Sequence, residues 1–223
     1  MNDIHLSSIV ETHVRLGVNN IIRPFCWIGA PPQVTRDAIV GGCTIGADNE
    51  FRENVSIHSG CAPNSTIIGD SNFLLAHAHI GHDVEIGSYC LLGHSASIGG
   101  HTWLGNYVNI GAGSFIAPFK SVGSFSYVSP GSLVDKNILP FCIAQGDRQK
   151  VRGLNIIGMK KNNFTGRQIQ ELNSIMHGIQ FNILATNIEK VLQKCRHIDE
   201  RIAIEFESYL EAINRLSQNK NTR

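Results

Sequence analysis

The chain has 223 residues and a mass of 24.4 kDa, enough for one domain with a small appendage. Apolar residues make up 42% and charged residues 17% of it, a balance that excludes a disordered chain. A net charge of +1 argues against a nucleic-acid-binding surface. No apolar run reaches the length of a membrane span, and no secretory signal follows Met1, so we expect a cytoplasmic protein.

The charge and the glycines are unevenly divided along the chain. Up to Asp147 there are 6 basic and 11 acidic residues, whereas from Arg148 onward there are 13 basic and 7 acidic residues. Of the 22 glycines, 18 precede residue 148. We therefore predict two parts, residues 1–146 and residues 147–223.

The N-terminal part begins with a step of six residues. Aliphatic residues follow this step in one run: Val10, Leu16, Ile22, Ile28, Val34 and Val40. A second run, offset by one residue, is Ile39, Ile45, Phe51 and Ile57. The segment Ser59–Thr66 then breaks the phase, and we interpret it as an inserted loop.

From residue 68 the step of six continues without a break for twelve positions. They are Ile68, Leu74, Ile80, Ile86, Leu92, Ile98, Leu104, Ile110, Ile116, Val122, Val128 and Val134, and glycine follows most of them. An α-helix would scatter these positions around its axis, whereas a short strand followed by a bend points each of them inward. The pattern predicts an all-β parallel β-helix built of hexapeptides, with a small residue at each bend.

This repeat resembles the left-handed parallel β-helix of the hexapeptide acyltransferases. In that family three hexapeptides form one coil of a triangular prism. The resemblance implies a homotrimer with active sites between neighbouring prisms.

After Pro140 the step of six ends and a helical spacing begins. Thr165 to Gln168 fits a capping box, and Thr186 to Glu189 fits a second one. Three apolar faces follow helical spacing: Ile169, Leu172, Met176, Ile179 and Ile183; Val191 and Leu192; and Ile202, Phe206, Tyr209, Ile213 and Leu216. We predict a C-terminal domain of three helices.

Six of the ten histidines fall between residues 58 and 101, most densely at His77, His79 and His82-Asp83. The string H-x-H-x-x-H-D permits a zinc site or a histidine general base. Three metal ligands on a rigid coil must lie at one corner, and the six-residue repeat does not place His77, His79 and His82 at one corner. The six cysteines also lack paired spacing. We therefore expect reduced cysteines, no bound metal and no bound cofactor.

General-base chemistry suits the residues that follow the string. Asp83 can orient His82 or favour its protonated form. His101 lies about one coil beyond His82, so both can line one groove. Gly100 precedes His101, and its amide can meet a developing oxyanion.

The segment from Leu74 to Asp83 resembles the catalytic coil of the UDP-N-acetylglucosamine O-acyltransferases that begin lipid A synthesis. The stretches Arg52–His58, Gly100-His101, Ile143–Gly146 and Gly153–Lys160 match that family in order and spacing. The resemblance implies transfer of a 3-hydroxyacyl group from acyl carrier protein to a sugar hydroxyl or amine. The donor is the phosphopantetheine thioester of that carrier, or coenzyme A, and the acceptor is a nucleotide sugar such as UDP-N-acetylglucosamine.

The same resemblance assigns roles to individual residues. His82 would be the general base, Asp83 its support, and Gly100 the oxyanion donor. His79 and His101 would contact the sugar nucleotide. Asn155 would contact donor or acceptor near the helices.

The chain also departs from the family pattern. It lacks a loop with an Asp and a Lys that help to bind the sugar nucleotide, and Ala117-Pro118 replaces a His-Gln pair. Ile157 replaces a nucleotide-contacting Glu, and Lys161 replaces an Arg. Pro130 stands where Gly gates a long acyl chain, which suggests a shorter one. These changes favour an altered nucleotide sugar.

Basic residues gather at the junction of the two parts: Arg148, Lys150, Arg152, Lys160, Lys161 and Arg167. They form a solvated face or a dock for acidic acyl carrier protein. Three alternatives to the acyl-carrier-dependent enzyme stay open. They are an acetyl-CoA-dependent N-acetyltransferase of nucleotide amino sugars, a non-catalytic scaffold, and a zinc trimer resembling the γ-carbonic anhydrases.

Overall fold

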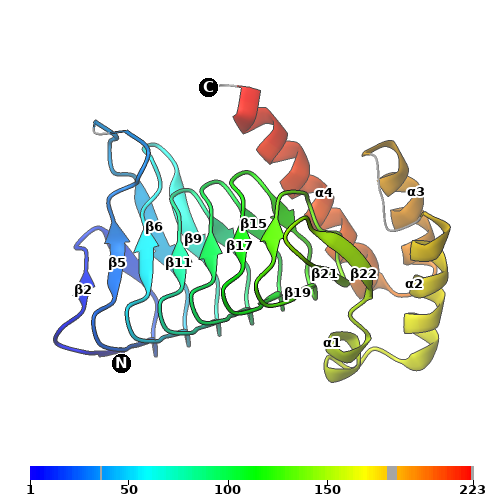
Figure 1. Cartoon of the computed structure of the whole chain (residues 1–223), viewed down its shortest axis with the longest axis horizontal. Helices are drawn as coiled ribbons and strands as arrows, with labels where there is room; N and C mark the ends of the chain where they lie inside the picture. The colour runs from blue at the N-terminus through cyan, green and yellow to red at the C-terminus, as the bar shows by residue number, and fades with distance from the viewer. Residues whose placement is uncertain (36, 180–184, 222–223) are drawn as a thin grey trace.

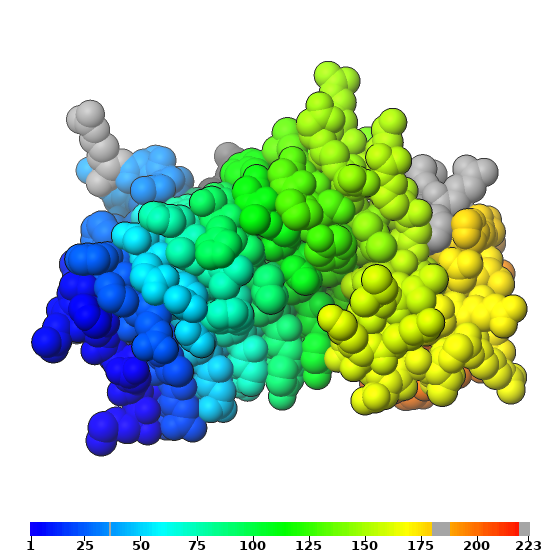
Figure 2. All heavy atoms as spheres, turned by 60° about the horizontal axis from the view of Figure 1, so that its bottom comes forward, coloured from blue at the N-terminus to red at the C-terminus, as the bar shows by residue number. Residues whose placement is uncertain are grey.

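A computed structural model describes residues 1–35, 37–179 and 185–221. The chain winds through three parallel sheets that form the faces of a prism, and the helices gather at its C-terminal end (Figure 1). Figure 2 shows the same order on the surface, with the coils following one another along a rod. This is the predicted left-handed parallel β-helix.

Each sheet takes one short strand from successive coils, and sheet A ends in the antiparallel strand β22. Sheet A contains β1 (Asp3–Ile4), β4 (Ile21–Ile22), β7 (Glu50–Phe51), β10 (Phe73–Leu74), β13 (Leu91–Leu92), β16 (Asn109–Ile110), β19 (Tyr127–Val128), β21 (Cys142–Gln145) and β22 (Lys150–Leu154). Sheet B contains β2 (Ile9–Val10), β5 (Trp27–Ala30), β8 (Ser56–His58), β11 (His79–Ile80), β14 (Ser97–Ile98), β17 (Phe115–Ile116) and β20 (Leu133–Val134). Sheet C contains β3 (Val14–Leu16), β6 (Gly42–Ile45), β9 (Ser65–Ile68), β12 (Glu85–Ile86), β15 (Trp103–Leu104) and β18 (Ser121–Val122).

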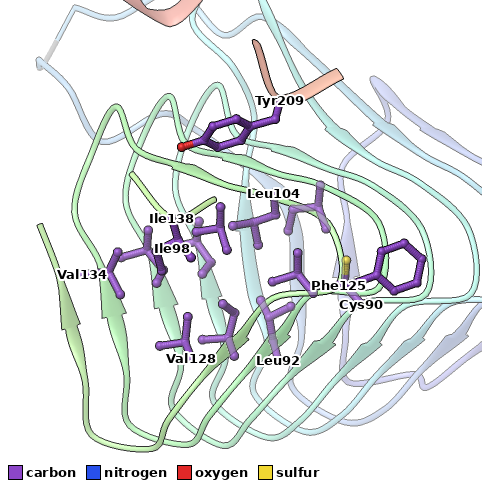
Figure 3. Close-up of a cluster of buried hydrophobic side chains, with 14 of the residues drawn as sticks. Cys90, Leu92, Ile98, Leu104, Phe125, Val128, Val134, Ile138 and Tyr209 are labelled. Carbon is purple, nitrogen blue, oxygen red and sulfur yellow. The ribbon is translucent and has the colours of Figure 1, made fainter. Parts of the chain in front are cut away.

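The twelve aliphatic residues of the unbroken run fill the interior of the prism, and each is at most 3% exposed. Figure 3 shows Leu92, Ile98, Leu104 and Val128 inside the coil. Consecutive coils keep a register of eighteen residues, so that Ile80 pairs with Ile98 and Ile98 with Ile116. The predicted core of this part is confirmed, because the step of six returns the same side of the chain to the axis.

The earlier runs are only partly confirmed. Ile22, Ile28, Ile45, Phe51 and Ile57 are buried. Val34, Ile39 and Val40 are instead 42%, 75% and 40% exposed. They lie in the connection between β5 and β6, which leaves the prism and rejoins it through a bridge between Val40 and Cys61. Inserted residues therefore include 31–35 and 37–41 as well as residues near 59–64.

The bends rely on a backbone feature that the glycine pattern did not reveal. Residues with positive φ lie three positions after most inward aliphatic residues, and most of them are not glycine. His77, Asp83 and His101, for example, have φ of 63°, 59° and 58°. The glycine that follows most of these aliphatic residues is required for a different reason, the close approach of neighbouring coils. At Gly81 an added Cβ would lie 2.8 Å from the Gly100 nitrogen, so only glycine lets the coils approach this closely.

The left-handed positions form columns along the corners of the prism. At the corner between sheets C and A, Tyr89 stacks on Tyr107, Tyr107 on Phe125 and Phe125 on Phe141, with ring centroids 4.7–5.2 Å apart. Phe164, which precedes the second helix, packs edge-on against Phe125 and Phe141. This aromatic column connects the prism to the helices.

The C-terminal part begins with the antiparallel hairpin of β21 and β22 and continues into α1 (Ile156–Lys161), α2 (Gly166–Gly178), α3 (Ala185–Arg196) and α4 (Glu200–Asn221). α1 was not predicted; Asn155 caps it by accepting a hydrogen bond from the Gly158 amide. The predicted boundary between residues 146 and 147 falls in the turn of the hairpin and stays a prediction.

The described residues of all three predicted helical faces are buried or packed against the core, and the capping box at Thr165 is present. The second predicted capping box is wrong, because α3 begins at Ala185 and Thr186 is already helical. Ile183 lies outside the described residues. α4 packs against sheet C, where Tyr209 contacts Trp103 and Arg215 forms an ion pair with Glu85. Among the described helices, none is long and apolar enough to cross a membrane.

Candidate active site

The corner between sheets B and C brings together four of the residues that the sequence singled out. His82 and Asp83 lie in the turn between β11 and β12, and Gly100 and His101 occupy the same turn one coil later. The His101 amide donates a hydrogen bond to the His82 carbonyl, with 3.0 Å between nitrogen and oxygen. This bond joins the two turns.

His82 is oriented by its neighbour. Its Nδ1 lies 2.7 Å from Asp83 Oδ2, and the Asp83 side chain is only 3% exposed. Burial by itself raises the pKa of the Asp83 carboxyl. The hydrogen bond from His82, the charge of His101 and the Cys61 amide outweigh burial and lower this pKa below its ordinary value. Since an ionised carboxylate only accepts, His82 donates through Nδ1 and keeps a lone pair on Nε2.

The His82 ring packs against Gly100. A Cβ added to Gly100 would lie 2.6 Å from His82 Nε2. Among the hydrogen bonds of the described residues, none is donated by the Gly100 amide. One coil later the same position is Pro118, which has no N–H, so the repeat needs no coil-to-coil bond there. The corner therefore holds an oriented imidazole next to a backbone N–H that no hydrogen bond of the described residues uses.

His101 completes the corner. Its ring lies edge-on to the His82 ring at 4.9 Å and stacks on Phe119 at 4.5 Å. Its Nε2 lies 3.5 Å from Asp83 Oδ2, so both imidazoles share one carboxylate. His101 is 5% exposed. This arrangement fixes the corner without depending on a mobile side chain.

His79 points out of sheet B on the adjoining strand β11. Its Nδ1 is 2.8 Å from Ser56 Oγ, and its ring lies edge-on to His58 at 5.1 Å. Burial, and then the charge of His58, lower the pKa of His79, which favours its neutral form. His58 donates through Nδ1 to the Pro31 carbonyl at 2.6 Å. This pair is therefore tied to the loop of residues 31–41.

The other predicted site residues lie elsewhere on the same chain. Asn155 and Lys161 line a groove of about 450 Å³ beside sheet A, together with the aromatic rings of Tyr89, Tyr107 and Tyr127. Pro130 is exposed at the corner between sheets A and B. Within one chain, neither of these places joins the His82 corner.

The predicted carrier-binding residues are all exposed. Lys150 and Arg152 alternate with Val151 on β22 and thus point to the same side of that strand. Arg148 lies in the preceding turn, and Lys160 lies in the last turn of α1.

The three histidines of the string lie at three places: His77 in the corner between sheets A and B, His79 on β11, and His82 in the next corner. Cys61, however, was missed by the sequence analysis. Its amide donates to Asp83 Oδ1 at 3.0 Å, and its sulfur lies within 4.8 Å of ligand atoms of His82 and Asp83. Its position in the inserted loop gave no signal of this proximity.

The role of Asp83 in holding the corner predicts an acid-dependent stability. A carboxyl with a lowered native pKa stabilises the fold above its ordinary pKa of about 3.9, and this contribution is lost as the pH falls through the native pKa. Asp83→Asn should therefore reduce the free energy of unfolding by a constant amount above about pH 5. The difference from the parent should shrink below about pH 4. Urea unfolding of the parent and of Asp83→Asn between pH 3 and 7 measures this difference in the free energy of unfolding. A difference that does not change with pH would contradict the stabilising role of the ionised Asp83.

Comparison with known proteins agrees with this geometry. Residues 137–218 match the family model described as "Udp N-acetylglucosamine O-acyltransferase; Domain 2", and residues 65–100 match "Bacterial transferase hexapeptide (six repeats)". An acyl-[acyl-carrier-protein]–UDP-N-acetylglucosamine O-acyltransferase of Thermodesulfovibrio yellowstonii is 42% identical over 175 residues, or 77% of this chain and 66% of that relative.

The enzyme of the same name from Saccharophagus degradans is 39% identical over 215 residues, covering 90% of this chain and 83% of that one. Among solved structures, a UDP-N-acetylglucosamine acyltransferase from Bacteroides fragilis superposes with a TM-score of 0.82. It shares 28% identity and covers 96% of this chain and 83% of its own.

Proposed function

Since this chain belongs to the UDP-N-acetylglucosamine O-acyltransferase family, we propose that it transfers an acyl group from acyl carrier protein to a hydroxyl of a nucleotide-linked sugar. UDP-N-acetylglucosamine is the first acceptor to consider, because it appears in the names of the relatives. The observation that carries the proposal is the corner where Asp83 holds Nδ1 of His82 and the His82 ring packs against Gly100.

The reaction follows from that corner. His82 Nε2 takes the proton of the sugar hydroxyl as its oxygen attacks the thioester carbonyl, and Asp83 stabilises the resulting imidazolium. The Gly100 N–H donates to the oxyanion of the tetrahedral intermediate. When the intermediate collapses, the carbon–sulfur bond breaks, and His82 returns the proton to the leaving thiolate. No acyl-enzyme and no metal enter these steps.

The remaining assignments are proposals of the same kind. His79 and His101 contact the sugar nucleotide, and Asn155 and Lys161 contact donor or acceptor in the groove beside sheet A. Ile157 is 71% exposed and lines that groove where the family has an acid, which supports an altered nucleotide contact. Pro130 shortens the acyl chain. Because the groove and the His82 corner lie on different faces, a homotrimer would let neighbouring chains combine them.

The identity of the acyl donor indicates the cellular compartment in which we propose that the reaction takes place. Acyl carrier protein is the donor in the names of the relatives, so we place the reaction in the cytoplasm, where such a carrier is acylated. The test is incubation with UDP-N-acetylglucosamine and carriers bearing 3-hydroxyacyl groups of graded length, with products identified by mass spectrometry. Transfer of acetyl from acetyl-CoA to an amino sugar, with no transfer from acyl carriers, would instead support the N-acetyltransferase alternative.

Carrier binding gives a prediction on charge. Replacing Lys150 and Arg152 by glutamate should raise the KM for acyl carrier protein on the order of 10-fold, because an acidic partner loses its electrostatic attraction. The KM for the nucleotide sugar should change little. The matched control replaces Lys190 and Lys194 of α3, which are also exposed, by glutamate. If the KM for acyl carrier protein rose equally in the control, the effect would be one of overall charge, and the proposed binding of the carrier at Lys150 and Arg152 would be wrong.

A further inference from the structure

A thiol stands beside the proposed base, and the reaction does not use it. Cys61 lies between β8 and β9, at the same corner of the prism as Asp83. Its amide donates to Asp83 Oδ1, and the sulfur of Cys61, a nitrogen of His82 and an oxygen of Asp83 all lie within 4.8 Å of one another. The His82 side chain is 15% exposed, so this cluster is reachable from solvent.

These three side chains make a ligand set of sulfur, nitrogen and oxygen. Zn²⁺ prefers such donors, at about 2.3 Å from sulfur and about 2.0–2.2 Å from nitrogen and oxygen. Tetrahedral ligands then lie about 3.5 Å apart, which small rotations about the Cα–Cβ bonds can reach from the present separations. Three protein ligands would leave a fourth position for water.

The backbone holds these ligands in place. Asp83 and His82 are adjacent residues of one turn, and the Asp83 amide donates to Thr66 Oγ1 at 2.9 Å. Cys61 is tied from the other side by its bridge to Val40. Because the three Cα positions are fixed by separate hydrogen bonds, little chain entropy is lost when a cation binds.

We propose that Cys61, His82 and Asp83 form an inhibitory site for Zn²⁺ or another thiophilic divalent cation. Binding displaces the proton of the Cys61 thiol, which passes to solvent, and occupies a nitrogen of His82. No redox change is involved. The inhibitory consequence rests on the proposed function, since it requires His82 to act as the base; the binding itself does not.

Binding is tested without any substrate. Chelator-treated protein is titrated with Co²⁺, whose bond to a thiolate gives a charge-transfer band in the near ultraviolet. We expect one Co²⁺ per chain, a band that Zn²⁺ removes by competition, and loss of the band in Cys61→Ser. Cys195→Ala, which removes a buried thiol of α3, is the matched control and should keep it. A parent protein without the band, or a band that persists in Cys61→Ser, would overturn the site.

Inhibition is tested in the acyl-transfer assay. Zn²⁺ should inhibit the parent reversibly, with recovery on adding chelator. In Cys61→Ser the half-inhibitory concentration, relative to that variant's own metal-free rate, should rise at least about 100-fold, since even outer-shell partners of a metal are worth about 10–100-fold. Equal inhibition of parent and variant would refute the inhibitory role. If the chain transferred no acyl group at all, the proposed function would fail while the Co²⁺ titration still decided the site.

Discussion

His82→Ala is expected to lower kcat for acyl transfer by about 10²–10⁴-fold, the usual contribution of a general base. The proposed base is Nε2 of this imidazole, because Asp83 holds Nδ1 and the ring packs against Gly100. The exposed face of the prism should be unaffected, so circular dichroism and oligomeric state should match the parent. The measurement is initial rate by mass spectrometry at saturating donor and acceptor.

A second histidine provides the control for that variant. His94 is exposed at the corner between sheets A and B, one coil above Ala76. His94→Ala should retain the parental rate. Full activity in His82→Ala, or an equal loss in both variants, would remove His82 from its proposed role.

Gly100→Ala is expected to lower kcat by about 10²-fold or more, because it displaces the proposed general base, a group that usually contributes about 10²–10⁴-fold. The new methyl group would lie 2.6 Å from Nε2 and 2.7 Å from Cε1 of His82, closer than such atoms approach. The ring must therefore move away from the position in which Asp83 holds it. The change leaves the Gly100 N–H in place, so the loss of rate reports on the position of the imidazole.

The control for the glycine change is Gly166→Ala in the first turn of α2, where an added Cβ meets nothing within 4 Å. This variant should keep its rate and fold. A Gly100→Ala protein with parental kcat would show that the position of the imidazole does not limit the reaction. Imidazole resonances of His82 followed by NMR separate a displaced ring from a merely slowed step.

Much of the prism could be predicted because one rule, an inward aliphatic every sixth residue, acts at every coil. The rule failed at Val34, Ile39 and Val40, where the step of six continues by chance through a connection outside the prism. A local pattern cannot show whether its residues lie in a coil or in a loop. α1 was missed for a related reason, since Asn155 and a single turn carry too short a signal.

The site was predictable in part. The pairing of His82 with Asp83 follows from adjacency, and the meeting of Gly100 with His82 follows from the spacing of one coil. Cys61 was not predictable, because an insertion of irregular length shifts the register between β8 and β9. The separation of Asn155 and Lys161 from that corner also required the three-dimensional arrangement.

The aromatic column at the corner between sheets C and A has a thermodynamic consequence. Stacked repeats normally unfold in a graded way, since each coil contacts only its neighbours. Here the aromatic column is a continuous stack of four rings, those of Tyr89, Tyr107, Phe125 and Phe141. Phe164 and Phe206, which belong to the helical part, contact rings of this column. Fraying of the last coils would therefore disrupt the packing of the helices as well. An acidic prism and a basic tail, distinct in composition, are in this way made to melt as one cooperative unit.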